Sequence, residues 1–267
     1  MTPPVQVVTE FVTVGGVSVA YQIAGQGHPL VCVHGNFASK RWFTELLRDP
    51  PAGWQVIAPD QPNFGDSDAL PGPITLGAYT TYLHGFVEAL GLERVALLGH
   101  SLGGGVVQLF AAAYPKLTRG LVLVGSPTPE GLVTAEEHYP FLEGLRGDRE
   151  AMAQALAPTM SGRLPDYFGG IVDDALKMHP DGFSGNARAL ENLTLDGRAL
   201  DPGTVTCPVL VVRGETDYLI SPRMAARTAA AYPNGRLAAM SGLGHSPQIE
   251  DPERFRVLLT EFLEGLP

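Results

Sequence analysis

The segment Val95-Ala-Leu-Leu-Gly99-His-Ser101-Leu-Gly103-Gly-Gly105 decides the predicted fold of this chain. A short apolar run ends in Gly-x-Ser-x-Gly, and an alanine-rich amphipathic segment follows and stops before Pro115. This pattern predicts a strand, a sharp turn and a helix, with a serine at the apex of the turn. A side chain at either outer glycine would crowd such a turn. We therefore expect an exposed serine hydroxyl at the end of a strand, beside a helix N-terminus that favours developing negative charge.

Apolar runs recur along the chain and predict a sheet. Two alternating segments joined by a pair of glycines predict an antiparallel hairpin, Val5–Val14 and Val17–Ala24. Six later runs are short and apolar, which is typical of buried parallel strands: Pro29–Val33, Trp54–Ala58, Val95–Leu98, Leu121–Val124, Val209–Val212 and Leu237–Met240. Helical patterns separate them, at Ser39–Arg48, Leu76–Leu90, Leu102–Tyr114, Pro222–Ala231 and Pro252–Leu263. The predicted fold class is α/β, with an open, mostly parallel sheet of eight strands flanked by helices.

One interval, residues 127–203, breaks the alternation of strands and helices. It has no convincing strand and instead holds four helical pieces, Glu137–Leu145, Arg149–Leu156, Pro165–Met178 and Phe183–Leu195. We interpret it as a helical cap inserted after the sixth strand, with residues 1–126 and 204–267 forming the core domain. Most of its large apolar residues should form its own core, and some should line a pocket beneath it: Phe141, Met152, Met160, Tyr167, Phe168, Met178 and Phe183.

Length and composition exclude several classes of protein. The 267 residues fit one sizeable domain with an insertion, and no apolar run approaches the roughly 18–20 residues that span a bilayer. The first residues, Met1-Thr-Pro-Pro-Val5, lack the pattern of a signal peptide, so we expect a cytoplasmic protein. The formal charge of −10, without a basic cluster, argues against nucleic-acid and membrane partners. Cys32 and Cys207 are expected to be buried free thiols, and neither a metal nor a cofactor is implied.

Two further strand ends supply partners for the serine. A serine hydroxyl is a weak nucleophile near neutral pH, and it needs a base that is itself held by an orienting group. The strand Val209–Val212 runs into a turn that carries Glu215 and Asp217, and the strand Leu237–Met240 runs into a glycine-containing loop that carries His245. The chain order is then nucleophile, acid and base, and His245 must be neutral to accept the serine proton.

The motifs at the ends of four predicted strands resemble those of the α/β-hydrolase-fold enzymes, and the resemblance covers essentially the whole chain. Gly99–Gly103 is similar to the nucleophile elbow of that family, Gly214-x-x-Asp217 to its acid turn, Gly244-His245 to its histidine loop and His34-Gly35 to its oxyanion loop. The family places its acid at the fourth position from the glycine, which favours Asp217 over Glu215. The resemblance thus implies a catalytic triad of Ser101, Asp217 and His245.

Two backbone N–H groups should stabilise the oxyanion that forms during acyl transfer. One is that of Leu102, directly after the nucleophile, and the other belongs to the loop His34-Gly35-Asn36-Phe37, either at Asn36 or at Phe37. We expect His34 to be structural and His100 to pack beneath the turn. The other four histidines, His28, His84, His138 and His179, are interpreted as ordinary surface or helix residues.

Several members of the family catalyse other reactions, and this sequence argues against some of those reactions more clearly than against others. Haloalkane dehalogenases and epoxide hydrolases need an aspartate where this chain has Ser101. C–C bond hydrolases of aromatic ring cleavage share a proline at Pro62 but usually have a bulky aromatic residue at Ser246. They also use a cap arginine for the substrate carboxylate, for which Arg163, Arg188 and Arg198 are available. Perhydrolases share the triple glycine at 103–105 but tend to have proline in the oxyanion loop.

A different class of protein is a small-molecule receptor of the same fold with a slow triad, because a fold does not fix a function. The insertion shows no obvious exposed apolar stripe for a protein partner. The sequence favours a serine hydrolase that cleaves a small-molecule carboxylic ester or lactone through an acyl-enzyme. It leaves the substrate, the oligomeric state and the alternatives of C–C hydrolase, perhydrolase and receptor open.

Overall fold

The centre of the molecule is a single sheet of eight strands. The structure, a computed structural model, describes residues 6–267, and the strands follow the order β1-β2-β4-β3-β5-β6-β9-β10. The first two form the predicted antiparallel hairpin, β2 is also antiparallel to β4, and every other neighbouring pair is parallel. The bounds are β1 (Val8–Val14), β2 (Val17–Gly25), β3 (His28–Val33), β4 (Trp54–Pro59), β5 (Val95–His100), β6 (Thr118–Val124), β9 (Val209–Gly214) and β10 (Gly235–Met240). The predicted fold class is confirmed, while Val5, the expected start of the first strand, lies outside the described residues.

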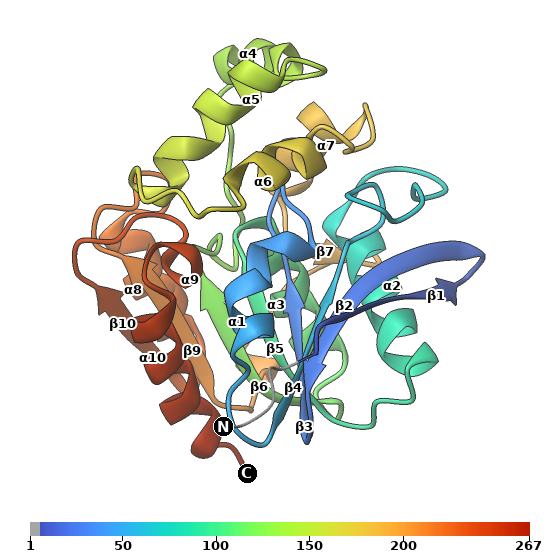
Figure 1. Cartoon of the computed structure of the whole chain (residues 1–267). Coiled ribbons are helices and arrows are strands. Elements are labelled where there is room, and N and C mark those ends of the chain that lie inside the picture. The colour runs from blue at the N-terminus through green and yellow to red at the C-terminus, as the bar shows by residue number, and fades with distance from the viewer. Residues whose placement is uncertain (1–5) are drawn as a thin grey trace.

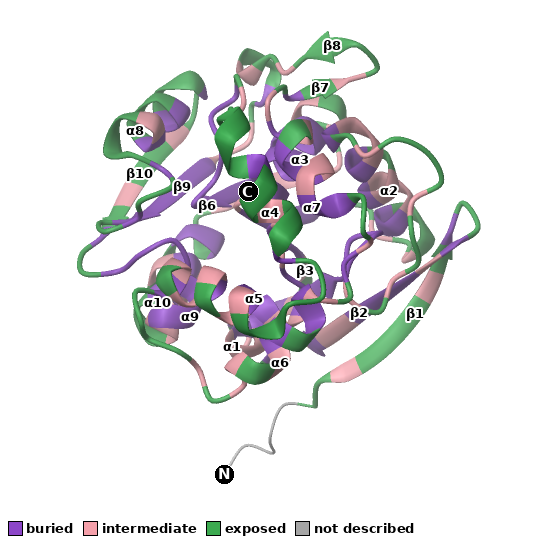
Figure 2. Ribbon diagram, turned by 90° about the horizontal axis from the view of Figure 1, so that it is seen from above, coloured by how far each residue is buried: buried purple, intermediate pink, exposed green. Residues whose placement is uncertain are grey.

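Helices cover both faces of this sheet (Figures 1 and 2). One face carries α1 (Thr44–Arg48) and α10 (Pro252–Glu264), which contact one another, and the other carries α2 (Leu76–Ala89), α3 (Leu102–Ala113) and α8 (Pro222–Ala231). The predicted helix Ser39–Arg48 is divided into a 3₁₀ turn, η1 (Lys40–Phe43), and α1, and a short helix, α9 (Pro247–Glu250), was not predicted. Within residues 6–267, no helix combines the length and the apolar character needed to cross a bilayer.

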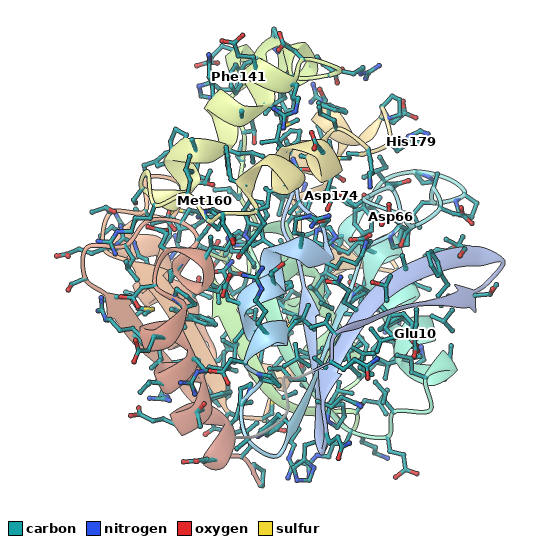
Figure 3. All side chains as sticks on the ribbon, viewed as in Figure 1. Glu10, Asp66, Phe141, Met160, Asp174 and His179 are labelled. Carbon is teal, nitrogen blue, oxygen red and sulfur yellow. The ribbon has the colours of Figure 1, made fainter. Side chains whose placement is uncertain are left out.

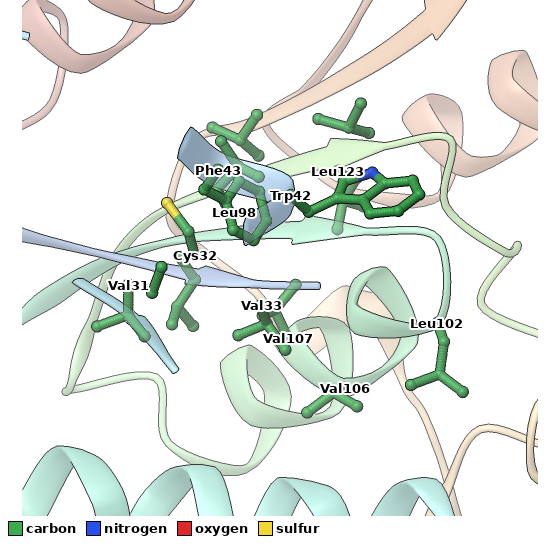
Figure 4. Close-up of a cluster of buried hydrophobic side chains, with 14 of the residues drawn as sticks. Val31, Cys32, Val33, Trp42, Phe43, Leu98, Leu102, Val106, Val107 and Leu123 are labelled. Carbon is green, nitrogen blue, oxygen red and sulfur yellow. The ribbon is translucent and has the colours of Figure 1, made fainter. Parts of the chain in front are cut away.

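The core lies between the central strands and the helices on either side. Every residue of β5 and β9 is buried, as expected for parallel strands that are covered on both faces. Figure 4 shows part of this cluster, where Trp42 and Phe43 of η1 approach side chains of β3 and β5, with Val106 and Val107 of α3 nearby. Both cysteines are free thiols, but only Cys32 is fully buried, and Cys207 is partly exposed. Burial raises the pKa of the Cys32 thiol, so this side chain remains protonated and acts as an apolar residue.

The segment between β6 and β9 lies above the carboxyl edge of the sheet (Figure 1). We call residues 127–203 the cap segment. Its helices correspond to the four predicted pieces, and α4 and α5 lie farther from the sheet than α6 and α7. The bounds are η2 (Glu136–His138), α4 (Tyr139–Gly144), α5 (Arg149–Leu156), η3 (Ala157–Met160), α6 (Phe168–Ala175), α7 (Gly182–Ala189) and η4 (Pro202–Thr204).

The expectation that this segment contains no strand was wrong. The last predicted helix ends at Ala189 instead of Leu195, and Thr194–Leu195 (β7) pairs with Arg198–Ala199 (β8) in a small hairpin. The turn is Asp196-Gly197, in which both residues have positive φ, 50° and 73°. An Asp-Gly pair favours this two-residue hairpin turn because its backbone tolerates positive φ. The turn signal was therefore present in the sequence, and the helical pattern before it obscured it.

A cluster of charged side chains joins α6 of the cap segment to the core. Asp174 of α6 accepts hydrogen bonds from Ser39 Oγ at 2.9 Å and Arg41 Nε at 2.8 Å. Lys177, one turn further, contacts Asp66 at 2.8 Å, and Asp66 in turn contacts the buried Lys40 at 2.7 Å. Asp66 and Asp174 lie near one another where α6 meets the core (Figure 3). The hydrogen bonds from Lys177 and then Lys40 lower the pKa of the Asp66 carboxyl from 3.8 to about 2.

We expect this cluster to make the fold sensitive to acid. A carboxyl whose pKa is lower in the folded protein than in the unfolded chain stabilises the fold above its unfolded pKa, and this stabilisation is lost as the pH falls toward the folded value. For Asp66 the window runs from its usual value of 3.8 down to about 2. Asp66→Asn should therefore lose less unfolding free energy across this window than the wild type, as measured by urea unfolding from about pH 5 to about pH 2.5. Equal losses in the two proteins would contradict the assignment.

Candidate active site

Ser101 sits in a strained turn between β5 and α3. Its backbone has φ 51° and ψ −119°, a conformation that costs a non-glycine residue on the order of 1–3 kcal/mol and persists only where the surroundings enforce it. Its N–H donates to the carbonyl of Val124 on β6 at 2.9 Å, and its own carbonyl accepts from Gly104 N–H at 2.8 Å. These bonds hold the turn from both sides, and the side chain of Ser101 lines a cavity above the sheet edge.

The two outer glycines of the turn are required by close backbone approaches, as predicted. A Cβ on Gly103 would lie 2.2 Å from the carbonyl oxygen of Val33, and one on Gly99 would lie 2.5 Å from the carbonyl oxygen of Gly103. The turn thus packs directly against the end of β3, so the residues that follow β3 lie beside Ser101.

Asp217 and His245 are brought together at the carboxyl ends of β9 and β10. His245 Nδ1 lies 2.9 Å from Asp217 Oδ2, and Asp217 Oδ1 accepts the backbone N–H groups of Leu219 and Ile220 at 2.9 and 3.0 Å. Burial alone would raise the pKa of the Asp217 carboxyl, but the hydrogen bond from His245 and these two backbone donors lower it below its usual value. Asp217 is therefore ionised at neutral pH, and its carboxylate favours the His245 tautomer that carries a proton on Nδ1 and leaves Nε2 unprotonated.

Glu215, the competing acid in the sequence, points elsewhere. Its carboxylate accepts the N–H of Gly242 at 3.0 Å, and the residue is exposed. The structure therefore pairs His245 with Asp217 and not with Glu215.

His245 Nε2 is buried and has no hydrogen-bond partner among the described residues. The ring lines the same cavity as Ser101. Gly125, at the end of β6, leaves room for this ring, because a Cβ there would lie 2.8 Å from two of its atoms. An unpaired basic nitrogen in a site shared with a serine hydroxyl is available to accept the proton of that hydroxyl.

Two charged residues that sequence reasoning missed hold the acid turn and the histidine loop. Arg213 is buried at the end of β9, and its guanidinium donates to the carbonyls of Ile220, Glu215 and Asp217 at 2.6, 3.1 and 3.0 Å. The available signal was a charge at the end of an otherwise apolar strand, because such a charge requires buried partners.

Glu250 of α9 does the same for the histidine loop. Its carboxylate accepts the N–H of Gly244 at 2.7 Å and that of Ser246 at 3.0 Å, on either side of His245. The available signal was an acidic residue in the first turn of a helix that follows His245, because a carboxylate there can accept unpaired N–H groups at the helix start.

The predicted oxyanion donors lie on two sides of Ser101. Leu102 is the first residue of α3, while Asn36 and Phe37 belong to the loop after β3 and line the cavity. Gly35 places this loop against the nucleophile, since a Cβ on it would lie 3.0 Å from Ser101 Cβ. Phe37 has a positive φ of 52°. None of the N–H groups of Leu102, Asn36 and Phe37 has an acceptor among the described residues.

His34 and His100 are neutral residues of the framework, as expected. Burial lowers the pKa of His34, whose Nε2 accepts the N–H of Gln61 at 3.0 Å and whose Nδ1 lies 2.8 Å from the Gly35 carbonyl. Burial, with the nearby His245, lowers the pKa of His100 well below its usual value, and its ring stacks on Trp42. Of the four histidines that were interpreted as ordinary, His138 lines the cavity.

The cavity above Ser101 has a volume of about 670 Å³, and the described residues that form its wall include no lysine, arginine, aspartate or glutamate. Large apolar side chains make up much of it, contributed by the core, the cap segment and the acid turn: Trp42, Leu132, Phe141, Leu156, Leu190 and Leu219. Four exposed apolar residues form its rim, Val133, Phe141, Tyr218 and Leu219. In the part of the chain that the structure describes, no group of three or more His, Cys, Asp or Glu side chains is placed to hold a metal ion.

The large apolar residues of the cap segment divide between the cavity and the interior, but the interior ones join the main core cluster instead of forming a core of their own. Phe141 lines the cavity, at the top of the molecule in Figure 3. The others pack into the core cluster, with Met152, Met160, Met178 and Phe183 buried and Tyr167 and Phe168 partly buried. None of the three candidate arginines Arg163, Arg188 and Arg198 lines the cavity.

Comparison with known proteins defines the family. Residues 28–168 match the family described as "alpha/beta hydrolase fold", and the chain belongs to that family. It is 31% identical to 2-hydroxymuconate semialdehyde hydrolase of Pseudomonas putida, over 78% of this chain and 76% of that protein. It is 30% identical to pimeloyl-[acyl-carrier protein] methyl ester esterase of Neisseria meningitidis serogroup B, over 87% of this chain and 92% of that protein. Among solved structures, a thermophilic esterase of Thermogutta terrifontis superposes with a TM-score of 0.78 at 25% identity, over 96% of this chain and 98% of that one.

Proposed function

We propose that this hydrolase cleaves neutral carboxylic esters or lactones through an acyl-enzyme on Ser101. The observation that carries the proposal is the orientation of His245: its Nδ1 lies 2.9 Å from Asp217 Oδ2, and its buried Nε2 has no hydrogen-bond partner in the described part of the chain. The His245 ring lines the cavity that Ser101 also lines. A base oriented in this way is what a serine hydroxyl needs to become a nucleophile.

The reaction follows from these roles in two halves. Ser101 Oγ attacks the carbonyl carbon while its proton passes to His245 Nε2, and the carbonyl oxygen becomes an oxyanion. The tetrahedral intermediate then collapses, the bond to the leaving oxygen breaks, and His245 returns the proton to that oxygen. A water molecule next gives a proton to His245, attacks the acyl-enzyme and releases the carboxylic acid, after which Ser101 recovers its proton. For a lactone the leaving oxygen remains tethered to the acyl group.

We assign the oxyanion hole to the backbone N–H groups of Leu102 and Asn36, with Phe37 as the alternative to Asn36. All three N–H groups lack an acceptor within residues 6–267, and the oxyanion loop approaches the turn of Ser101. Donors that are fixed before the reaction stabilise the developing charge without further reorganisation. In this proposal residues 127–203 act as a cap over the core formed by 1–126 and 204–267.

The uncharged wall of the cavity favours an ester or lactone over a ring-cleavage product that carries a carboxylate. A buried carboxylate without a cationic partner loses its hydration at a high cost in free energy. Of the three candidate arginines, Arg188 pairs with Glu136 at 3.2 Å and stacks on Tyr139. A volume of about 670 Å³ suits a substrate larger than an acetyl ester.

We predict a preference for neutral substrates, which a matched pair of esters tests. p-Nitrophenyl hexanoate and the mono-p-nitrophenyl ester of adipic acid present acyl chains of the same length, but only the second ends in a carboxylate. The hexanoate should have a kcat/KM at least about tenfold higher, since a difference of about 1.4 kcal/mol in binding is sufficient for that ratio. A series from acetate to decanoate and a lactone panel should then locate the preferred size.

The remaining outcomes separate the alternatives. An equal or higher kcat/KM for the adipate ester would contradict the preference for neutral substrates. Silence on every ester and lactone, together with C–C cleavage of a ring-cleavage product, would replace the proposal with a C–C hydrolase. A single burst of acylation without turnover would support a receptor with a slow triad.

A further inference from the structure

The oxyanion loop and the turn after it are held by the cap segment at almost every residue. Phe37 packs against Phe183 of α7, with ring centroids 5.6 Å apart. Ser39 and Arg41 both donate to Asp174 of α6, and Lys40 is linked through Asp66 to Lys177. The backbone between Asn36 and Arg41 therefore rests on the unit formed by α6 and α7, which lies between the sheet edge and α4–α5 in Figure 1.

The contact at Asn36 belongs to a buried chain of hydrogen bonds. Asn36 Oδ1 accepts from Asn186 Nδ2 at 2.9 Å, and Asn186 Oδ1 accepts from the Tyr79 hydroxyl at 2.7 Å. That hydroxyl accepts in turn from Asn63 Nδ2 at 3.2 Å. Asn186 and Tyr79 are almost completely buried, so their polar atoms depend on these partners.

We propose that Asn186, on cap helix α7, is a positioning residue that fixes the oxyanion loop through the side chain of Asn36. This inference rests on the proposed function, because it assigns Asn36 N–H to the oxyanion hole. The hydroxyl of Tyr79 fixes which end of the Asn186 amide faces Asn36, and the hydrogen bond to Asn36 then fixes the side chain of a residue whose backbone N–H faces the reacting oxygen. α7 is therefore a fixed part of the catalytic geometry as well as a wall of the cavity.

The expected effect is on the transition state and not on substrate binding. Loss of one oxyanion donor costs about 10²- to 10³-fold in kcat, and a displacement of about 1 Å can cost about 10²-fold. Asn186 is absent from the cavity wall that a substrate would contact. Its loss should therefore lower kcat and leave KM little changed.

Asn186→Leu tests this, because leucine is close to asparagine in shape and removes all the hydrogen bonds of the amide. We expect kcat to fall by about 10²-fold, with KM within about threefold of the wild type. Inhibition by an alkyl trifluoromethyl ketone, which forms an oxyanion on Ser101, should weaken in parallel with kcat/KM. Binding of the corresponding secondary alcohol, which forms no oxyanion, should not change. Asn192→Leu, the same change at an exposed asparagine of the cap segment, is the matched control.

Tyr79→Phe provides a second variant in case Asn186→Leu fails to fold. It removes only the hydroxyl that orients Asn186, so kcat should fall by about tenfold, with the same selective loss of ketone affinity. An unchanged kcat in the folded variants would overturn the proposal, as would equal losses in ketone and alcohol affinity. A wild-type protein that binds the ketone no more tightly than the alcohol would instead contradict the serine mechanism itself.

Discussion

Replacing Ser101 by alanine is expected to lower kcat by at least about 10³-fold, because the alanine side chain has no hydroxyl with which to form the proposed acyl-enzyme. The residual rate would come from the oxyanion donors and from binding of the substrate in the cavity. The fold should remain, because the turn is held by backbone bonds to Val124 and Gly104 that do not involve the hydroxyl. Steady-state hydrolysis of a preferred p-nitrophenyl ester, with a thermal unfolding curve for each protein, measures both effects.

Ser184→Ala is the matched control for this variant. Ser184 lies in α7 of the cap segment and is absent from the cavity wall, and its hydroxyl donates a hydrogen bond to the carboxylate of Glu143. The control should keep wild-type turnover. Near-wild-type turnover in Ser101→Ala would sink the serine mechanism, whatever the behaviour of the control.

Asp217→Asn is expected to lower kcat by about 10³- to 10⁴-fold, and the reason lies in the hydrogen bonds of the carboxylate. The backbone N–H groups of Leu219 and Ile220 both point at Oδ1, so an asparagine must keep its oxygen there. Its NH₂ group then faces His245 Nδ1, which has to become the acceptor. The proton of the neutral ring moves to Nε2, where it blocks removal of the serine proton.

Glu215→Gln is the matched control for the acid, since it neutralises a carboxylate in the same turn. Glu215 is exposed, and among residues 6–267 its carboxylate accepts only the N–H of Gly242, so we expect a change in kcat of less than about threefold. The pair is measured as kcat for one ester at neutral pH. A larger loss for Glu215→Gln than for Asp217→Asn would transfer the role of the acid to Glu215.

The core of the fold could be predicted from the sequence because its strands are buried on both faces. Val95–Leu98 and Val209–Val212 are short apolar runs with turns and helices on either side, a pattern typical of parallel strands in a covered sheet. The hairpin β7–β8 was missed because its strands have two residues each, too few for any periodicity. Its only signal was the Asp196-Gly197 turn.

The candidate active site could likewise be predicted only in part. Ser101, Asp217 and His245 each follow a strand, so topology alone brings them to one edge of the sheet, and the structure places Asp217 and not Glu215 on the histidine. The contact between the cap segment and the oxyanion loop could not be predicted, because its partners are far apart in the sequence. Asn186 is 150 positions from Asn36, and no local pattern around either residue indicates that they meet.

The cap segment could be recognised as an insertion, but its relation to the site required the structure. Phe141 and Phe183 are both large apolar residues on predicted helices, yet one lines the cavity and the other supports Phe37. Which face of a short helix meets the cavity depends on how the helices pack against one another, and periodicity does not determine that packing. The contacts of α6 and α7 with residues 36–41 therefore could not be foreseen.

The proposal depends above all on the acyl-enzyme, which mass spectrometry of the digested protein can detect and assign to a residue. The protein is mixed with p-nitrophenyl hexanoate, quenched in acid during turnover and digested so that the modified peptide is identified. We predict a hexanoyl adduct on the peptide that contains Ser101. The adduct should form and decay at rates consistent with kcat, and it should be absent from Ser101→Ala. Two results would contradict an acyl-enzyme on Ser101. One is turnover without any adduct that persists at the same rate in Ser101→Ala, and the other is an adduct on another residue.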